Sequence, residues 1–570
     1  MPRRLRKIVV WVSCATIYLG AWGWLLPTAT DQLRAAEPKQ RGEQPQSAMT
    51  VDVIIRNATI VDGTGAAWVP ADVAITGGRI VAVGKLTSLT GKETIDASDR
   101  VLCPGFIDLH SHADGGILEH RAAENYIRQG VTTLVCGNCG SSPTNVAKFF
   151  EQLRDGGTGP NIALLLGHGS LRREVVGTAN VPAVGEQLDE MKRLVRSAMQ
   201  AGACGMSTGL TYSPSAYGTT AELTALVKEL APFNGFYATH IRDEGTKVFE
   251  ALDEAIEIGR ESGVPVHISH HKISAAAVFG LTRLTLQRID DARKSGLDVT
   301  LDQYPYGAGS GSLSFYVPQS SLSGGLDAYR RRVADPAERA KIVTGVEDVF
   351  VRKLFEAGQR QDDAETIAAA LTRVQIARVP QDAKLSGKNL TEILRSRGLE
   401  PTVHNGAEAL VDLVALGAIG INHTIDDRPG GDVDRVMQHP LTAIASDGNV
   451  FEFGQDHPHP RSYGCFPRVL GHYVRERKLL KLEDAIRKMT LLPAQRLGWH
   501  DRGTIAPGQW ADIVVFDPQK VIDKATFIEP HQHSIGIEQV LVRGEFVLKN
   551  GQMTGKLPGQ PLPGQGKRDK

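Results

Sequence analysis

The chain has 570 residues, in which 64 lysines and arginines balance 64 aspartates and glutamates, so the formal net charge is +0. This length is enough for a large buried core and for more than one domain. The balanced charge argues against nucleic-acid binding, and six scattered cysteines do not form the framework of a disulfide-stabilised fold. The sequence carries no signal for an oligomeric state.

Residues 1–36 are predicted to be a signal peptide or a membrane anchor. Basic residues at positions 3–7 precede an uncharged apolar run at positions 8–26. This order is typical of a secretory signal, and the run is also just long enough to span a bilayer. We therefore expect an exported protein, periplasmic or extracellular, with either cleavage near Ala36 or membrane attachment through residues 8–26. Residues 37–50 are polar and are predicted to be a linker.

Short strands are predicted at both ends of the remaining chain. Residues 51–104 and 500–556 contain alternating apolar runs, such as 79–83 and 511–516, separated by glycine and asparagine turns. We expect these two segments to form one small β-sandwich domain. Residues 557–570, which contain several prolines, are expected to be a disordered tail.

The middle of the chain, residues 105–499, alternates strand and helix patterns and predicts an α/β fold with a closed (β/α)8 TIM-like barrel. A segment near 310–410 is expected to be an insertion at the barrel mouth. Two strand-like runs, 374–379 and 418–422, have no place in the barrel pattern. The expected barrel strands are 106–112, 131–138, 162–167, 205–209, 235–241, 264–270, 297–304 and 442–447.

Residues that can bind a metal ion follow the ends of these strands. His110 and His112 end the first strand, where residues two apart point to the same side. Active sites of such barrels lie at the carboxyl ends of the strands, and histidine, cysteine and aspartate together are typical zinc ligands. The sequence therefore predicts a metal site. Its expected ligands are His110, His112, Cys139, His240, His270 and Asp447.

This ligand order resembles the amidohydrolase superfamily, and further details resemble its N-acyl-D-amino-acid deacylases (D-aminoacylases). Many superfamily members with two metals bridge them with a carboxylated lysine on strand four, but 205–209 reads Gly-Met-Ser-Thr-Gly. Cys139, in the sequence Cys-Gly-Asn-Cys-Gly, takes the place of that lysine, as is typical of these deacylases. The resemblance covers residues 53–559. Other matching stretches are 167–172, 207–212, 240–244, 269–272, 302–306, 446–448 and 459–461.

The resemblance implies zinc-dependent hydrolysis of N-acyl-D-amino acids, which releases a carboxylate and a D-amino acid. It implies one tight zinc site formed by Cys139, His240 and His270, and a second, weaker site formed by the other three ligands with Cys139 bridging. Asp447 would be the catalytic acid and base. The small-molecule substrate's carboxylate would be bound by Lys272 and Arg461, with Tyr304 as a hydroxyl donor.

Two alternatives stay open at this point. The first is another amidohydrolase activity, such as that of a dipeptidase or of a cyclic imide or amide hydrolase. The insertion near 310–410 and the stretch 449–459 are longer than we expect for the deacylases, and both leave the substrate side chain open. The second alternative is a catalytically dead, membrane-anchored binding protein, which the presence of all six ligands argues against.

Overall fold

The computed structural model describes residues 50–568. The predicted signal or anchor, and all of the linker except Thr50, lie outside these residues. Within the described range, no helix is both long enough and apolar enough to cross a membrane. The described residues 50–568 form a single compact unit.

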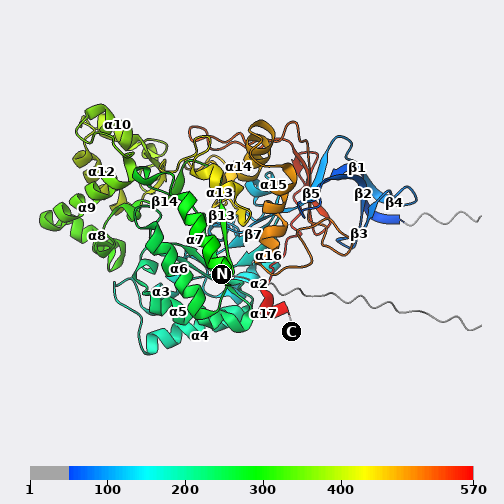
Figure 1. Ribbon diagram of the computed structural model, residues 1–570, viewed down its shortest axis with the longest axis horizontal. Coiled ribbons are helices and arrows are strands. Elements are labelled where there is room, and N and C mark those ends of the chain that lie inside the picture. The colour runs from blue at the N-terminus through cyan, green and yellow to red at the C-terminus, as the bar shows by residue number, and fades with distance from the viewer. Residues whose placement is uncertain (1–49, 569–570) are drawn as a thin grey trace, which may run out of the picture. The chain divides into compact units, whose positions relative to one another are not determined.

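Eight parallel strand positions close into a barrel, which confirms the predicted fold class (Figure 1). The first and last strands are joined by a parallel bridge between Ser111 and Gly448. The third position consists of two short strands, β8 and β9, separated only by Leu165. In order, the barrel strands are β6 (Phe106–Asp108), β7 (Val131–Cys136), β8 (Asn161–Leu164) with β9 (Leu166–Gly167), β10 (Gly205–Gly209), β11 (Phe236–His240), β12 (Val266–Ile268), β13 (Val299–Gln303) and β17 (Thr442–Ile444).

Helices between the strands, and three more after the last strand, cover the outside of the barrel. Their apolar faces pack on strands whose residues are buried throughout, as expected for parallel strands with side chains on both sides covered. The helices are α1 (Glu124–Ile127), α2 (Val146–Gly156), α3 (His168–Val175), α4 (Glu186–Ala201), α5 (Thr220–Val227), α6 (Val248–Ser262), α7 (Thr282–Lys294), α13 (Asp432–Gln438), α14 (Arg461–Arg468), α15 (Leu482–Met489) and α16 (Leu491–Arg496).

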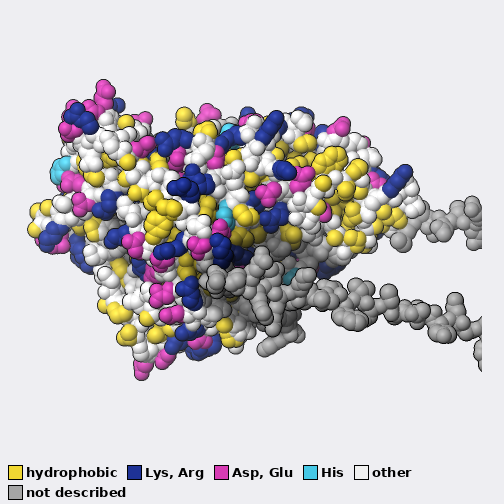
Figure 2. Space-filling model, in the orientation of Figure 1, with side chains coloured by type: hydrophobic (Ala, Val, Ile, Leu, Met, Phe, Trp, Pro, Cys, Tyr) yellow, Lys and Arg dark blue, Asp and Glu magenta, His cyan; other side chains and the backbone are white. Residues whose placement is uncertain are grey.

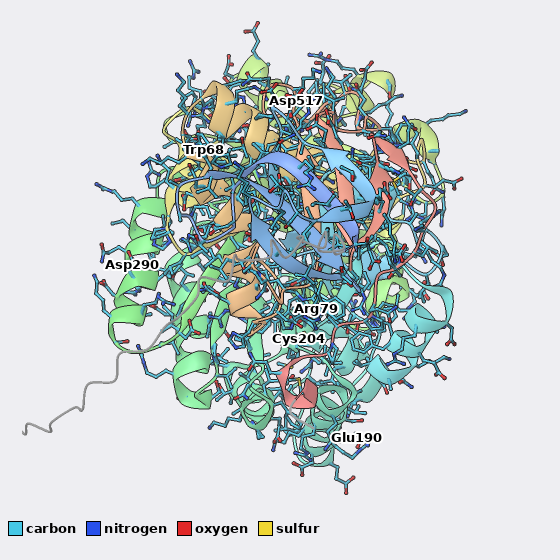
Figure 3. The ribbon with its side chains drawn as sticks, turned by 90° about the vertical axis from the view of Figure 1, so that its right-hand side faces the viewer. Trp68, Arg79, Glu190, Cys204, Asp290 and Asp517 are labelled. Atoms are coloured by element: carbon cyan, nitrogen blue, oxygen red, sulfur yellow. The ribbon has the colours of Figure 1, made fainter. Side chains whose placement is uncertain are left out.

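Strands from both ends of the chain form one sheet domain, as predicted. Its nine strands share one hydrogen-bonded sheet, which turns back on itself because Arg79 pairs with Trp510 just before β18. Apolar residues of β1–β3 and of β18–β20 therefore share one hydrophobic cluster. Figure 3 looks onto this domain, with Arg79 and Asp517 labelled. The strands are β1 (Thr50–Ile60), β2 (Val69–Thr76), β3 (Arg79–Gly84), β4 (Thr90–Asp96), β5 (Val101–Pro104), β18 (Ile513–Phe516), β19 (Ile537–Val542), β20 (Glu545–Lys549) and β21 (Gln552–Met553).

The insertion is longer than the predicted 310–410 and has a hydrophobic core of its own. The two runs without a place in the barrel pattern are β15 and β16, which pair antiparallel with each other, while β16 also pairs with β14. The four longer helices α8, α9, α10 and α12 lie together in Figure 1. The elements are β14 (Gly309–Ser312), α8 (Gly325–Ala334), α9 (Pro336–Leu354), α10 (Ala364–Thr372), β15 (Val374–Arg378), α11 (Leu390–Ser396), α12 (Val403–Ala415) and β16 (Ile419–Asn422).

Local sequence explains where α9 of the insertion begins. The Asp335 carboxylate accepts hydrogen bonds from the backbone N–H groups of Ala337 (2.9 Å) and Glu338 (3.0 Å). Pro336 occupies the first helical position, where its missing N–H costs nothing. Five apolar residues of the helix, among them Val346 and Phe350, are buried in the insertion core. The N-terminal cap and the buried apolar residues therefore fix the position of α9 in the insertion.

The predicted disordered tail is wrong for residues 557–568. Leu562 is buried, and its N–H donates to Ile162 O of the barrel strand β8 (2.7 Å). Pro558 and Pro561 form isolated bridges with Thr158 and Ile162, and α17 (Gln565–Arg568) follows. The prolines suggested disorder, but here the tail packs beside residues 158–162 of the barrel.

On the face shown in Figure 2, acidic and basic side chains are interspersed. The sheet domain exposes apolar side chains, among them Trp68 (53% exposed) and Val69 (52%). These two residues lie at and just before the start of β2.

Candidate metal centre

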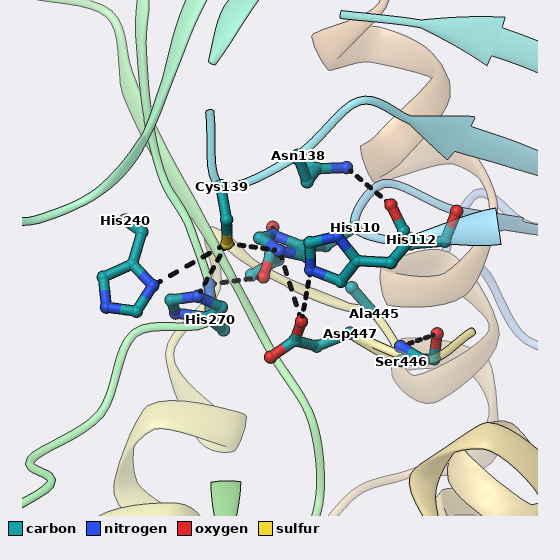
Figure 4. Close-up of polar contacts among 12 residues, drawn as sticks. His110, His112, Asn138, Cys139, His240, His270, Ala445, Ser446 and Asp447 are labelled. Carbon is teal, nitrogen blue, oxygen red and sulfur yellow. Dashed lines mark hydrogen bonds and ion pairs between the residues drawn. The ribbon is translucent and has the colours of Figure 1, made fainter. Parts of the chain in front are cut away.

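The six predicted ligands meet at the mouth of the barrel (Figure 4). They form two groups, in each of which the donor atoms lie within 4.8 Å of one another. Cys139, His240 and His270 make one group, and His110, His112, Cys139 and Asp447 make the other. Cys139 is the only residue that belongs to both groups.

The Cys139 thiol lies at the centre of this cluster. Its Sγ is 3.3 Å from His110 Nε2, 3.4 Å from His270 Nε2 and 3.7 Å from His240 Nδ1. The second group is completed by Asp447, whose Oδ1 lies 3.0 Å from His112 Nε2 and 3.5 Å from His110 Nε2. These distances place the six donor atoms around one shared space, where they could bind metal ions together.

Several ligands lie beyond the strands rather than on them, which corrects the sequence-based geometry. Strand β6 ends at Asp108, so His110 and His112 belong to the turn that follows it. Cys139, His270 and Asp447 have φ of 50°, 34° and 51°, a region that residues other than glycine rarely adopt. Such strain is typical of functional sites, where the surrounding structure holds an unfavourable backbone.

Closure of the barrel itself brings the last ligand to the first. The N–H of Asp447 donates to His110 O (2.7 Å), and the N–H of His112 donates to Gly448 O (2.8 Å). These backbone bonds join the turn after β6 to the turn after β17. Two ligands more than 300 residues apart are therefore positioned by the same contact that closes the sheet.

Strand β10, which lacks the bridging lysine, supports the loop that carries Cys139. Ser207 on this strand accepts a hydrogen bond from Gly140 N (3.0 Å) and donates one to Gly137 O. A Cβ atom on Gly209 would lie 2.2 Å from Cys139 O. The small residues of β10 thus leave room for the cysteine loop to lie directly on the strand.

Two buried carboxylates hold the histidines from behind. Glu244 Oε1 lies 3.2 Å from His270 Nδ1 and 2.6 Å from Lys272 Nζ. Asp302 accepts a hydrogen bond from His270 N (2.6 Å) and lies 2.6 Å from His267 Nε2. Carboxylates behind ligand histidines fix ring orientation and raise ligand basicity. The sequence analysis gave neither Glu244 nor Asp302 a role in the site, although both lie within stretches that match the family, 240–244 and 302–306.

Asp447 is an ionised carboxylate in spite of its burial. Burial would raise its pKa, but the positive charge of Arg461 and the nearby His270 and His110 rings hold it well below its usual range. Arg461 Nη1 lies 2.8 Å from Asp447 Oδ2, on the side opposite the histidines. The carboxylate therefore carries no proton at neutral pH, which is the state that a general base requires.

The donor set fits a zinc ion. One sulfur, four imidazoles and a carboxylate are the ligand types that zinc prefers. Burial, and then the Asp447 carboxylate, raise the pKa of the Cys139 thiol well above its ordinary value, so a thiolate here needs a cation beside it. His110 Nδ1 is buried 3.6 Å from Asp302 Oδ2, so a carboxylate also faces this ring on the side away from Cys139. Cys139, His240 and His270 would hold one ion, and His110, His112 and Asp447 would complete a second position.

A cavity of about 650 Å³ opens above the centre. The three residues predicted to bind substrate all line it, but they lie in different surroundings. Lys272 is committed to Glu244 and to His270 Nδ1, 2.9 Å away. The Tyr304 hydroxyl is buried without a hydrogen-bond partner among the described residues. The Arg461 guanidinium lies over the Tyr304 ring, 4.8 Å from its centre.

The chain belongs to the amidohydrolase family, whose model matches residues 93–548. The predicted family and enzyme class, a hydrolase acting on amide bonds, are thereby confirmed. A model of the urease alpha-subunit N-terminal domain also matches residues 29–99, most of which belong to the sheet domain.

Among individual proteins, the chain is 35% identical to the D-aminoacylase of Alcaligenes xylosoxydans xylosoxydans, over 90% of this chain and 97% of that protein. It is similar to a solved D-aminoacylase with a binuclear metal centre, for which one-metal activation and second-metal attenuation are described (TM-score 0.75, 35% identity, 90% and 100% coverage). It is also similar to the N-acyl-D-glutamate deacylase of Bordetella bronchiseptica complexed with zinc and a phosphonate inhibitor (TM-score 0.75, 32% identity, 90% and 100% coverage).

Proposed function

We propose that this chain is a zinc-dependent N-acyl-D-amino-acid deacylase. It would hydrolyse the amide bond of its substrate and release a carboxylate and a D-amino acid. The observation that carries the proposal is one thiol shared by two donor groups, with an ionised, arginine-paired carboxylate in the second group. Similarity to D-aminoacylase and to N-acyl-D-glutamate deacylase supports the substrate class.

Asp447 moves the proton in this proposal. A bound zinc ion would supply Lewis acidity toward the amide carbonyl and the attacking water. The ionised Asp447 carboxylate accepts the proton of the attacking water and then delivers it to the amide nitrogen, which leaves only when protonated. Its Oδ1 faces the histidines and its Oδ2 faces Arg461, so the carboxylate lies between the ligands and the cavity.

Arg461 and Tyr304 would hold the substrate's α-carboxylate. Arg461 is 4% exposed, and its Nη1 lies close enough to Asp447 for an ion pair. The N–H bonds of Nη1 do not point at an acceptor among the described residues, so they make no hydrogen bond. The Tyr304 hydroxyl is equally unpartnered. Two buried donors without acceptors, side by side in one cavity, are suited to an incoming carboxylate. Lys272 would contribute mainly by positioning His270 and Glu244.

The test is hydrolysis of matched N-acetyl-D- and N-acetyl-L-amino acids by protein depleted of metal and then reloaded with zinc. We expect hydrolysis of D substrates only, loss of activity on metal depletion and recovery with zinc. Cys139→Ala is the control and should bind little zinc and turn over little substrate. A zinc-loaded wild-type protein that hydrolyses no N-acyl amino acid refutes the proposal, and hydrolysis of dipeptides or cyclic imides instead would select the alternative amidohydrolase activity.

We also propose that residues 1–36 direct export, with either signal cleavage or membrane attachment. The support is the basic start followed by the apolar run 8–26. Fractionation of cells that express the full chain should recover the protein outside the cytoplasm. Recovery of the intact chain in the cytoplasm would contradict export, and a mature N-terminus near Ala36 would select cleavage over anchoring.

A further inference from the structure

The cavity above the metal centre is larger than one N-acyl amino acid with a small side chain requires. Its volume of about 650 Å³ lies in the range that accommodates drug-sized ligands. Residues of the barrel and residues of the insertion, among them Phe315, Lys353 and Arg378, line it together. The insertion therefore contributes to whatever lies beyond the α-carboxylate and the scissile amide.

Most cationic groups of this cavity are already paired. Lys272 lies 2.6 Å from Glu244, Arg461 lies 2.8 Å from Asp447, and Arg242 lies 2.8 Å from Glu254. Two more line its outer part: Arg378 lies 3.5 Å from Asp456, and Arg173 is exposed to solvent. Arg461 is assigned to the α-carboxylate, and the other four cations are either paired with a carboxylate or exposed to water.

Lys353, near the end of α9, differs from these groups. Its Nζ donates one hydrogen bond, to Ser274 O (3.2 Å), and lies 5.4 Å from the centre of the Phe315 ring. No carboxylate within residues 50–568 lies within 4.0 Å of this amine. A lysine ammonium has three donors, so two of them remain for a ligand.

The position of Lys353 is fixed from both sides. Its backbone belongs to the capped helix α9, which packs on the insertion core, and Ser274, its acceptor, lies two residues after Lys272 in the loop that carries His270. The acidic groups that face it are committed elsewhere: Glu244 pairs with Lys272, and Asp243 accepts hydrogen bonds from the N–H groups of residues 245 and 247. Burial lowers the pKa of the Lys353 amine, and a nearby anion would offset this cost.

We propose that Lys353 recognises a second carboxylate of the substrate, distinct from the α-carboxylate, so that the enzyme prefers N-acyl amino acids with two negative charges. This inference rests on the proposed deacylase function. The second carboxylate can come from an acidic side chain or from an acyl group that ends in a carboxylate. Both sources present the same chemistry to one half-buried ammonium group.

The test compares acids with their neutral amide isosteres. One arm uses N-acetyl-D-glutamate against N-acetyl-D-glutamine and N-acetyl-D-aspartate against N-acetyl-D-asparagine. The other arm uses N-succinyl-D-leucine against the N-acyl derivative in which the terminal carboxylate is a carboxamide. The variants are Lys353→Met, Lys353→Arg and Arg352→Met, the last being an exposed cation one residue away on the same helix.

In Lys353→Met, we expect the acid-to-amide ratio of kcat/KM to fall about ten- to a hundredfold in one arm, the scale of one hydrogen bond to a charged group. Lys353→Arg should keep much of the preference, and Arg352→Met should match the wild type. The arm that responds identifies the source of the second carboxylate. Ratios unchanged in both arms, with zinc content and Tm preserved, overturn the inference.

A binding measurement separates this inference from the proposed function. Calorimetric titration with the same acids and amides is carried out in the zinc-loaded Asp447→Asn background, with and without Lys353→Met, so that the substrate stays intact and the heats report affinity. Weaker binding of an acid, but not of its amide, to Lys353→Met supports the subsite even if no substrate is hydrolysed. Equal affinities with and without Lys353→Met refute the subsite even if the enzyme is an active deacylase.

Discussion

Replacement of Arg461 by methionine tests the carboxylate-binding role most directly. Methionine keeps an unbranched side chain of similar reach but removes five N–H donors and the positive charge. In the structure, the guanidinium is buried, donates from Nη2 to Ser310 O (3.1 Å) and lies 2.8 Å from Asp447. Its loss therefore has two consequences, one for substrate binding and one for the catalytic carboxylate.

The two consequences can be separated by the choice of substrate. A hydrogen bond to a charged group contributes about 1.5–3 kcal/mol, or about ten- to a hundredfold in kcat/KM, and only substrates with an α-carboxylate lose it. The second effect is common to all substrates, because Arg461 is the first of the charges that hold the pKa of Asp447 low against burial. We therefore expect a moderate loss on N-acetyl-D-amino acid amides and a loss about ten- to a hundredfold larger on the matching acids.

The assay is the ratio of kcat/KM for an N-acetyl-D-amino acid to that for its α-carboxamide, measured for wild type and Arg461→Met at equal zinc content. If both substrates lose activity equally, Arg461 serves Asp447 alone and the α-carboxylate is held elsewhere. If neither loses activity, the guanidinium has no part in the site. Either result would refute the proposal that the Nη1 donors of Arg461 bind the α-carboxylate of the substrate.

Three further predictions concern the proton carrier, the cysteine loop and the barrel base. Asp447→Asn should keep zinc at Cys139, His240 and His270 but lower turnover at least about a hundredfold, the scale of lost general acid–base catalysis; turnover within a few-fold of wild type would make Asp447 structural. Gly209→Ala should lower zinc content, measured by elemental analysis, because its Cβ would lie 2.2 Å from Cys139 O, whereas full zinc occupancy would show that the loop adjusts freely. Burial lowers the pKa of Lys488 from 10.5 to about 8, so the unfolded chain binds more protons between these pH values and stability should rise with pH across that window. At about 1.36 kcal/mol per unit this amounts to about 3 kcal/mol, measured as the difference in unfolding free energy between wild type and Lys488→Met at pH 7.5 and 10.5; a difference independent of pH would contradict it.

The sequence by itself determined the class of fold and the membership of the metal centre. Alternation of strands and helices is a local property, so the barrel could be read from residue patterns. The six donors could be selected because each lies at or soon after the end of a strand, and all strands of a parallel barrel end on the same face. The absence of lysine from β10, together with Cys139 after β7, was equally visible in the sequence.

Only the tertiary structure decided how these groups act on one another. The left-handed backbone of Cys139 and Asp447 and the pairing of β15 with β16 depend on contacts between distant segments. The tail was misread for the same reason, since its order comes from packing on β8 rather than from its own composition. The partners of charged groups are likewise three-dimensional: Lys272 is committed to Glu244, while Lys353 reaches the cavity from an insertion that the sequence left without a role. Residue type limits what a side chain can do, but its charge, orientation and availability are set by neighbours that only folding brings within a few ångströms.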